Sequence, residues 1–295
     1  FKSKFVFTTD LGHNFTYKTS SQKIISLGYY TPFKDDSWII ERAGFKKTHS
    51  ISYLINKSFD YNISTSMLTS RIVSIDLCVF YPKCKPLGFP RNDELYHPSK
   101  DLRRTIVNHL GGNVKYIYCY TPTYRDFERT DLPLGLNEQF DNKTIWGNKT
   151  VDDDEKLNRI LSKHDSVVIV KMHPGQAKHV LFSSFNDKII HFDTLQKEIQ
   201  NLSLYDLLAI SDGLITDYTS TSFDYLHINK PIIYYFYDYE RYKTNRGFSF
   251  EPIQSFCGGP IAYSYDELLF HLEELCGGKD LYKNKRLEVH KLVNK

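Results

Sequence analysis

The chain has 295 residues, of which 41% are hydrophobic and 25% charged, and its formal net charge is +3 at pH 7. This composition is typical of a soluble globular protein of about two domains, since domains commonly run to ~100–200 residues. The charge is too mild to indicate nucleic-acid binding, although it permits an anionic ligand or an anionic membrane surface.

The five cysteines are odd in number and form no C-x-x-C pair, which argues against a disulfide framework or a zinc site and favours a reducing cytoplasm. No apolar run approaches the ~18 residues that a membrane-spanning helix needs, and no signal peptide is visible. The chain begins at Phe1 rather than Met, so we expect an excised part of a longer protein, in which an upstream segment could hold a membrane anchor.

Short β-rich runs are typical of a smaller α/β lobe near the start of the chain; they cover residues 4–8, 52–55 and 71–75. Residues 92–110 indicate a connection followed by a helix, and Gly111-Gly112 then interrupts the chain. We therefore predict an N-terminal, acceptor-side lobe over residues 1–110, which could be incomplete, and a C-terminal, donor-binding lobe over residues 111–295.

Strands and helices alternate in the second lobe, which is typical of a doubly wound sheet. The predicted strands cover residues 114–120, 166–171, 188–192 and the two ends of 212–237. The predicted helices cover residues 152–163, 203–210 with a Ser203/Asp206 capping box, and 265–275 before Gly277-Gly278. We expect a surface loop over residues 130–149 and a basic helix or frayed end after residue 282.

A hydroxyl-rich turn follows the apolar strand at Leu214 and Ile215. Thr219, Ser220 and Thr221 lie where the next helix begins, and hydroxyls and free backbone N–H groups at that place suit a phosphate. The alternative is an ordinary capping box formed by Thr221 and Asp224.

Two other strands are followed at once by polar residues. Residues 166–171 precede Met172-His173-Pro174-Gly175, and residues 114–120 precede Thr121-Pro122-Thr123-Tyr124-Arg125-Asp126. In open α/β sheets, ligands bind outside the carboxyl ends of parallel strands. Three such ends on one rim predict a pocket for a phosphorylated ligand.

Four segments occur in an order and at spacings typical of one enzyme family. They are Gly88-Phe89-Pro90-Arg91-Asn92-Asp93, residues 121–126, residues 215–225 with an Asp-Tyr-Thr-Ser core, and Tyr237-Asp238 followed by Arg246-Gly247-Phe248-Ser249-Phe250. Through them the chain resembles, from about residue 24 to 275, the CDP-glycerol glycerophosphotransferase family, which polymerises teichoic acids and related capsular polymers.

The resemblance implies a GT-B-like α/β fold with two Rossmann-like lobes and the ligand cleft between them. It implies transfer of a polyol phosphate, such as glycerol phosphate, from a CDP-activated donor to an acceptor hydroxyl of a cell-wall or capsular polymer, with release of CMP. The implied acceptor is polymeric or lipid-linked. The implied location is the cytoplasm, at the inner face of a bacterial membrane and in peripheral contact with it. No tightly bound cofactor and no metal-ligand spacing is indicated, although Mg²⁺ held by the diphosphate would leave little trace.

The catalytic candidates are His173, Arg91 and Asp93. His173 can donate a hydrogen bond to a diphosphate oxygen or neutralise the leaving phosphate, and the resembling family has a histidine there; the alternative is a buried structural histidine. Arg91 could face the cleft, and Asp93 could act as a base or orient an arginine, or mark a turn or helix cap.

The nucleotide-binding candidates are Arg125, Asp217, Thr219, Ser220, Thr221 and Arg246. Arg125 offers a planar fork for phosphate, with Asp126 to orient it, or forms a surface ion pair. Asp217 shapes the loop by accepting hydrogen bonds. Arg246 adds positive charge or is a solvated loop residue. The alternating aromatic residues in the run 232–242 are more typical of a strand packed on both faces than of a platform that stacks on a nucleobase.

One departure from the family is visible in the first lobe. Where the family has a His-Gly-Thr-Pro motif, this chain has Tyr29-Tyr30-Thr31-Pro32. The general base therefore stays open among His13, Asp35, Asp36 and Asp93, or the loose transition state needs little help from a base.

Two rival functions remain at this point. A GT-B glycosyltransferase that uses a CMP- or UDP-sugar would hold its nucleotide with the same His-Pro turn and hydroxyls. A non-catalytic lobe that binds polymer or a partner would explain the missing histidine motif.

Overall fold

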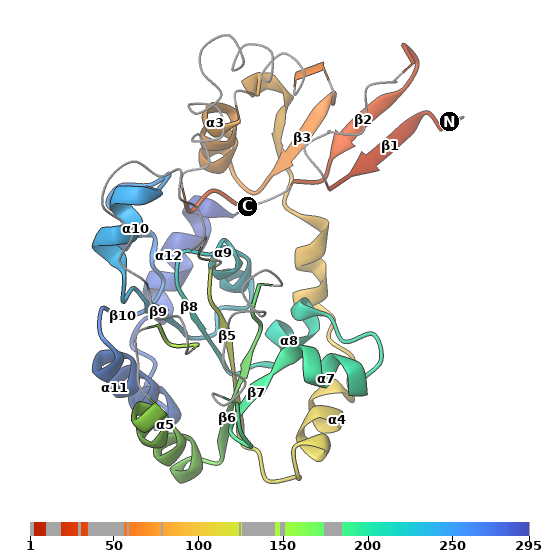
Figure 1. Ribbon diagram of the computed structural model, residues 1–295. Coiled ribbons are helices and arrows are strands. Elements are labelled where there is room, and N and C mark those ends of the chain that lie inside the picture. The colour runs from red at the N-terminus through yellow and green to blue at the C-terminus, as the bar shows by residue number, and fades with distance from the viewer. Residues whose placement is uncertain are drawn as a thin grey trace. The chain divides into compact units, whose positions relative to one another are not determined.

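The computed structural model describes residues 3–9, 19–28, 31–34, 56–57, 59–77, 79–123, 125, 145–147, 151–173 and 185–294. The chain forms two compact units, each drawn from separate stretches of sequence (Figure 1). The first unit comprises Phe1–Asp93, Glu240–Cys257 and Asn284–Lys295, and the second comprises Glu94–Tyr239 and Gly258–Lys283.

These compact units differ from the predicted division between residues 110 and 111. The first unit recruits two C-terminal stretches, and the second begins at Glu94, before the helix that we placed in the first lobe. Compactness depends on packing between distant segments, which a search for breaks along the chain does not detect. The functional division into an acceptor-side and a donor-side lobe stays a prediction.

The first unit contains a parallel sheet of four strands in the order β1-β2-β3-β4. The strands are β1 (Phe5–Thr8), β2 (Lys23–Ser26), β3 (Tyr61–Ser64) and β4 (Cys84–Pro86). Helix α3 (Met67–Asp76) packs on one face, where Ile24, Val73 and Leu77 belong to one apolar cluster. The other elements that lie wholly or mainly in this unit are η1 (Tyr81–Lys83), α10 (Tyr239–Asn245), η5 (Ile253–Phe256) and α12 (Lys283–Val293), and η2 (Pro90–Tyr96) begins in it.

The strand predicted over residues 71–75 is wrong, because these residues lie inside helix α3. Ser66 caps that helix through a capping box with Thr69, and Val73 and Leu77 are buried four residues apart, as on one face of a helix. The strand predicted over residues 4–8 is confirmed as β1, whereas residues 52–55 lie outside the described part of the chain.

The second unit contains a parallel sheet of six strands in the order β10-β9-β8-β5-β6-β7. The strands are β5 (Tyr116–Thr121), β6 (Ser166–Val170), β7 (Ile189–His191), β8 (Gly213–Thr216), β9 (Ile232–Tyr235) and β10 (Ile261–Ala262). Every residue of β6, β8 and β9 is buried, as expected for strands covered on both faces.

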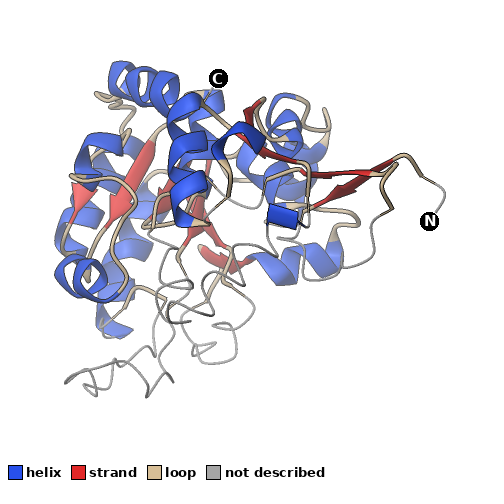
Figure 2. Cartoon of the chain, turned by 90° about the horizontal axis from the view of Figure 1, so that it is seen from above, coloured by secondary structure: helices blue, strands red, loops and turns tan. Residues whose placement is uncertain are grey.

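Helices cover both faces of this sheet (Figures 1 and 2). On one face lie α5 (Val151–Lys163) and α11 (Tyr265–Cys276), and on the other lie α4 (Leu102–His109), α7 (Phe192–Glu198) and α8 (Leu204–Ile210). The short helices α9 (Thr221–Tyr225) and η4 (Leu226–Ile228) follow β8. The predicted doubly wound arrangement and the Ser203/Asp206 capping box are both confirmed.

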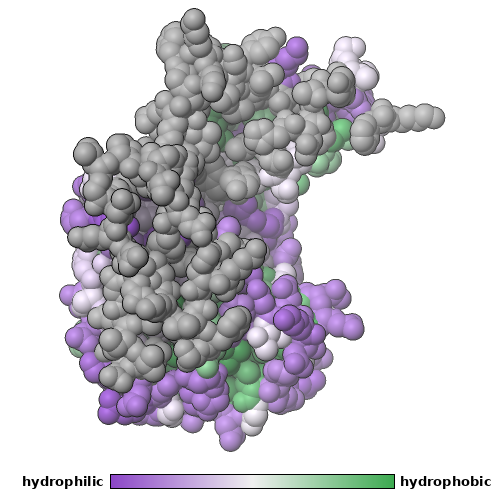
Figure 3. All heavy atoms as spheres, in the orientation of Figure 1, coloured by the Kyte–Doolittle hydropathy of each residue, from purple (hydrophilic) through white to green (hydrophobic). Residues whose placement is uncertain are grey.

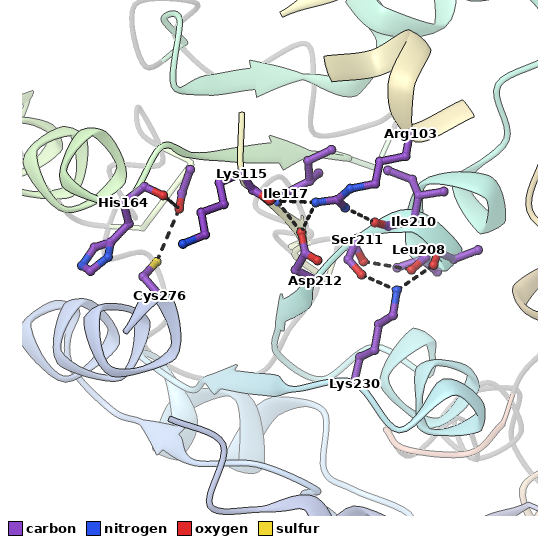
Figure 4. A network of polar contacts seen from close by, with 12 residues as sticks. Arg103, Lys115, Ile117, His164, Leu208, Ile210, Ser211, Asp212, Lys230 and Cys276 are labelled. Atoms are coloured by element: carbon purple, nitrogen blue, oxygen red, sulfur yellow. Dashed lines mark hydrogen bonds and ion pairs between the residues drawn. The ribbon is translucent and has the colours of Figure 1, made fainter. Parts of the chain in front are cut away.

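A network of charged side chains satisfies backbone groups at the amino edge of this sheet (Figure 4). Asp212 Oδ2 accepts hydrogen bonds from Ile117 N and Arg103 Nη2, both at 2.8 Å. Arg103 Nη1 donates to Ile210 O at 2.6 Å, and Lys230 Nζ donates to Ala209 O and Ser211 O. These charges hold the end of α8 to the start of the sheet and lie at the edge opposite the predicted site.

None of the described helices is long and apolar enough to cross a membrane. On the face shown in Figure 3, the described surface of the second unit is mainly hydrophilic, with smaller apolar areas between the polar side chains. Free cysteines at positions 84, 119, 257 and 276 are all buried.

Residues 145–147, the described part of the surface loop expected over residues 130–149, are buried, and Trp146 shows why. Its side chain is 1% exposed and stacks on Tyr120, with ring centroids 4.6 Å apart, and its carbonyl accepts a hydrogen bond from Tyr235 Oη. Next to it, a Cβ at Gly147 would lie 2.6 Å from the Tyr237 ring. Aperiodic sequence predicted an exposed loop, but the large indole between Ile145 and Gly147 buries these three residues in the core.

Replacing Trp146 with alanine should lower the free energy of unfolding of the second unit by about 3–5 kcal/mol, the usual cost of deleting a buried aromatic side chain. Denaturant titration followed by circular dichroism measures it. Phe270, which is 58% exposed, is the matched control, and Phe270→Ala should cost less than about 1 kcal/mol. Equal effects of the two substitutions would contradict the anchoring role.

Candidate active site

The three strand ends that the sequence singled out are neighbours in the sheet. β8, β5 and β6 are adjacent and parallel, with Thr121 paired to Thr216 in register and Lys171 N donating to Tyr120 O. Their carboxyl ends therefore share one edge, and the polar residues that follow them begin at that edge. Adjacent strands lie about 4.8 Å apart, so the ends of β6 and β8 are separated by roughly 10 Å.

Arg125 lies at the centre of a polar cluster at this edge and is itself buried, with 7% of the residue exposed. Its Nε and Nη2 donate to the two carboxylate oxygens of Asp238 at 2.8 and 3.0 Å. Its Nη1 donates to Thr123 O at 2.8 Å, and its Nη2 lies 2.9 Å from Asp217 Oδ2. Each nitrogen of the guanidinium thus has a protein partner.

Two further hydrogen bonds join the cluster to the strand ends. Thr123 N donates to Asp217 Oδ1 at 2.8 Å, and Tyr218 Oη donates to Asp238 Oδ1 at 3.0 Å. Asp217 follows β8, Asp238 follows β9 and Arg125 follows β5, so we define these three side chains with Tyr218 as the strand-end cluster. It ties three neighbouring strands together at their carboxyl ends.

The surroundings of two groups in the cluster, Arg125 and Tyr218, shift their pKa values. Burial alone would lower the pKa of Arg125, but the charges of Asp217, Tyr237 and Asp238 outweigh it and hold the pKa well above its ordinary value. Burial, together with the charge of Asp238, raises the pKa of Tyr218 far above its ordinary value, so the phenol stays neutral. One arginine facing two aspartates gives the cluster a formal charge of −1.

This geometry revises the expectation for Arg125. The alternative of a surface ion pair is wrong, because the guanidinium is buried. Asp126, the predicted orienting residue, lies outside the described residues. Asp217 and Asp238 occupy the fork that we assigned to phosphate. Arg125 therefore holds the segments that follow β5, β8 and β9 in place.

Thr219, Ser220 and Thr221, which we call the hydroxyl turn, directly follow Tyr218 of this cluster in the sequence. Asp217 and Tyr218 are buried, whereas Thr219, Ser220 and Thr221 are half-buried. Thr219 Oγ1 and Thr221 Oγ1 lie 3.2 Å apart, and Thr221 N donates to Thr219 Oγ1. The turn therefore presents a pair of half-buried hydroxyls directly after two buried residues of the cluster.

The alternative capping box at this turn is not formed. The N-cap residue of α9 is Ser220, which makes no side-chain capping bond, and Asp224 is buried and accepts from Tyr205 Oη at 2.6 Å. Because α9 has only five residues, its dipole is small, so an anion at this turn would have to be bound mainly by the hydroxyls.

His173 is exposed and lies three residues after the end of β6, at the same edge as the strand-end cluster. The alternative of a buried structural histidine is therefore wrong. Lys171, the other cation in this segment, is bound to Asp193, with Nζ to Oδ1 at 2.8 Å. Pro174 and Gly175 lie outside the described part of the chain.

The remaining candidates belong to the first unit. Arg91 is half-buried, with its guanidinium 4.2 Å from the centroid of the Phe89 ring, and Asp93 is exposed in η2. Arg246 is half-buried just after α10. Their meeting with the second-unit residues stays a prediction, and Tyr29, Tyr30, His13, Asp35 and Asp36 lie outside the described residues.

Sequence reasoning missed the roles of Tyr218 and Asp238 and assessed the aromatic run correctly. Tyr234 and Tyr235 fill the core on either side of β9, as expected for packed strand faces. Asp238 follows β9 as Asp217 follows β8, so the strand-end rule, applied to one strand more, would have included it.

The chain belongs to the CDP-Glycerol:Poly(glycerophosphate) glycerophosphotransferase family, whose model matches residues 1–295. It is 33% identical to a teichoic acid ribitol-phosphate primase of Bacillus spizizenii over 193 residues, which are 64% of this chain and 43% of that protein. It is 25% identical to a teichoic acid glycerol-phosphate transferase of Staphylococcus aureus over 271 residues, 88% of this chain and 64% of that one. The chain thus spans less than half of the primase.

A solved structure of the wall teichoic acid polymerase TagF matches 95% of this chain and 66% of its own, with a TM-score of 0.71 and 24% identity. This likeness concerns the fold, and it confirms the predicted α/β, GT-B-like architecture with parallel sheets.

Proposed function

We propose that this chain carries the transferase activity of its family, moving a polyol phosphate from a CDP-activated polyol to an acceptor hydroxyl of a cell-wall polymer and releasing CMP. The observation that carries the proposal is the convergence of His173, the hydroxyl turn and the strand-end cluster at one sheet edge. Membership of the family supports the choice of donor.

The second unit holds the nucleotide diphosphate in this proposal. The roughly 10 Å between the ends of β6 and β8 suits a ligand of that length. Thr219, Ser220 and Thr221 bind its phosphates, and His173 stabilises the charge that develops on the leaving CMP. Because the strand-end cluster carries a negative formal charge, His173 supplies the positive charge at this edge.

The first unit supplies the acceptor side. Arg91 and Arg246 contribute positive charge toward the transferring phosphate, and Asp93 accepts the proton of the attacking hydroxyl or orients one of these arginines. Positioning and electrostatic stabilisation provide most of the acceleration in phosphoryl transfer, so this set of residues suffices without a covalent intermediate.

The proposed partners are a CDP-polyol and a polymeric or lipid-linked acceptor. The proposed location is the cytoplasmic face of a bacterial membrane, where lipid-linked polymer would be extended, with peripheral contact to the bilayer. A Mg²⁺ ion coordinated mainly by the donor's diphosphate is compatible with this site. Among the described residues no group of three or more His, Cys, Asp or Glu side chains could hold a metal ion.

A donor screen tests the proposed reaction. The protein is incubated with acceptor and, separately, CDP-glycerol, CDP-ribitol, CMP-sialic acid or a UDP-sugar, and the nucleotide product and the extended acceptor are identified by mass. We expect CMP only from the CDP-polyols. Turnover of a nucleotide sugar would identify a GT-B glycosyltransferase instead, and nucleotide binding without turnover would identify a binding lobe.

The double substitution Thr219→Val and Thr221→Val should weaken CDP-glycerol binding about ten-fold, because each lost hydroxyl removes a hydrogen bond worth about 0.5–1.5 kcal/mol. Isothermal titration calorimetry measures this. Thr105→Val, on the exposed face of α4, is the control and should bind as the unmodified protein does. Unchanged affinity of the double variant would remove the hydroxyl turn from the site.

A further inference from the structure

A glycine and an aromatic ring make an unusually close contact at the carboxyl edge of the first unit's sheet. Gly28 follows β2 with φ of +86°, and a Cβ built on it would lie 2.0 Å from Phe89 Cε1 and 2.7 Å from Ile63 O. Only glycine allows this approach. The contact brings the segment after β2 against the segment after β4.

Two buried polar side chains flank that contact. Asn92 lies three residues after Phe89 and is 4% exposed, and among the described residues neither its Oδ1 nor its Nδ2 has a hydrogen-bond partner. Thr31 lies three residues after Gly28 and is 0% exposed, and its Oγ1 has no partner in the described part of the chain either. Three residues of extended chain span at most about 10 Å, so the Cα atom of Asn92 lies within that distance of Phe89, and the Cα atom of Thr31 within that distance of Gly28.

Unsatisfied buried amides are rare because each costs about 1–3 kcal/mol. The Asn92 amide has both a donor and an acceptor without a partner. A hydroxyl group can satisfy both, because it donates one hydrogen bond and also accepts. A cation is the neighbour of Asn92 in sequence, because Arg91 precedes it, and the Arg91 guanidinium stacks on the Phe89 ring. A hydroxyl next to an anionic phosphate ester fits this combination.

We propose that Asn92, with Thr31 and Arg91, forms a recognition site for the hydroxyl-bearing end of a polyol phosphate, the acceptor of the transfer. Asn92 and Thr31 bind the polyol hydroxyls, and Arg91 binds the adjacent phosphodiester. The site deepens the proposed function and rests on it, because the acceptor is defined only by that reaction.

The test is Asn92→Leu, which keeps the volume and removes both unsatisfied groups. With a CDP-polyol donor and a polymer acceptor, the KM for acceptor should rise about ten-fold while the KM for donor stays unchanged. The melting temperature should stay the same or rise, because an apolar group of similar shape replaces unsatisfied atoms. Asn108→Leu, at an exposed position of α4, is the matched control. An unchanged acceptor KM would overturn the site and leave buried water as the partner of Asn92.

A binding measurement separates this proposal from the proposed reaction. If no donor is turned over, glycerophosphoglycerol, the phosphodiester of two glycerols, is titrated into the unmodified protein and the Asn92→Leu variant. Binding that the substitution weakens supports the site, whereas equal affinity or none overturns it. Should the variant not fold, hydrogen exchange of the unmodified protein decides: the probe should protect backbone amides of residues 88–97, and unchanged exchange there overturns the site.

Discussion

Replacing His173 with alanine is expected to lower CMP release from a CDP-polyol by at least about 100-fold in the presence of acceptor. The side chain is exposed at the sheet edge, and Lys171, the other described cation of that segment, is bound to Asp193. Removing one well-placed group that stabilises transition-state charge commonly costs about 10²–10³ in rate. Initial rates of CMP formation, measured at saturating donor, give the loss in kcat.

The matched control is His109→Ala. His109 is also exposed but ends α4, on the side where the chain enters the amino edge of the sheet, so its removal should leave the rate unchanged. A His173→Ala variant that turns over as fast as the His109→Ala variant would show that the imidazole takes no part in the chemistry. The proposed transfer would then need another source of positive charge.

Replacing Arg125 with methionine is expected to destabilise the second unit by about 3–5 kcal/mol, because it leaves the buried carboxylates of Asp217 and Asp238 without their cation. The raised pKa of Arg125 means that its stabilisation is fully present below the ordinary arginine value and is lost only as pH rises above it, so the effect should be constant across neutral pH. Denaturant titration at pH 6 and pH 8 measures the loss in free energy of unfolding and shows whether it is the same at the two pH values.

A rescue experiment distinguishes the cost of unpaired charges in the strand-end cluster from the loss of the cluster's geometry. Adding Asp217→Asn and Asp238→Asn to the Arg125→Met variant removes the unpaired charges and should restore most of the lost stability. Transferase activity should stay low, because the cluster would no longer hold the hydroxyl turn in place. If Arg125→Met alone is as stable as the unmodified protein, the cluster is not an organising element.

The second unit was predictable because its buried strands are contiguous apolar runs. Residues 166–170 contain three valines and an isoleucine, and capping residues such as Ser203 mark the helices between the strands. In the first unit, β2 and β3 are four residues long and contain Lys23 and Asn62, so neither has the pattern of a covered strand. Short mixed strands gain their stability from neighbours that a local pattern does not contain.

The strand-end rule placed three candidate residues at one sheet edge but assigned partners incorrectly. His173, Arg125 and Asp217 each lie within four residues of the end of an apolar strand. It could not reveal that Arg125 binds Asp238, which lies 113 residues away, because that pairing depends on the order of strands in the sheet. With neighbouring sequence as the only guide, Asp126 was the natural partner.

Trp146 gives the second unit a built-in optical reporter. The chain has two tryptophans, and one of them, Trp146, is buried and stacks on Tyr120, a residue before the end of β5. In a Trp38→Phe background, its emission should be blue-shifted and respond when a nucleotide occupies the neighbouring sheet edge. Ligand screening could then proceed by fluorescence, without a radiolabelled donor or a coupled assay.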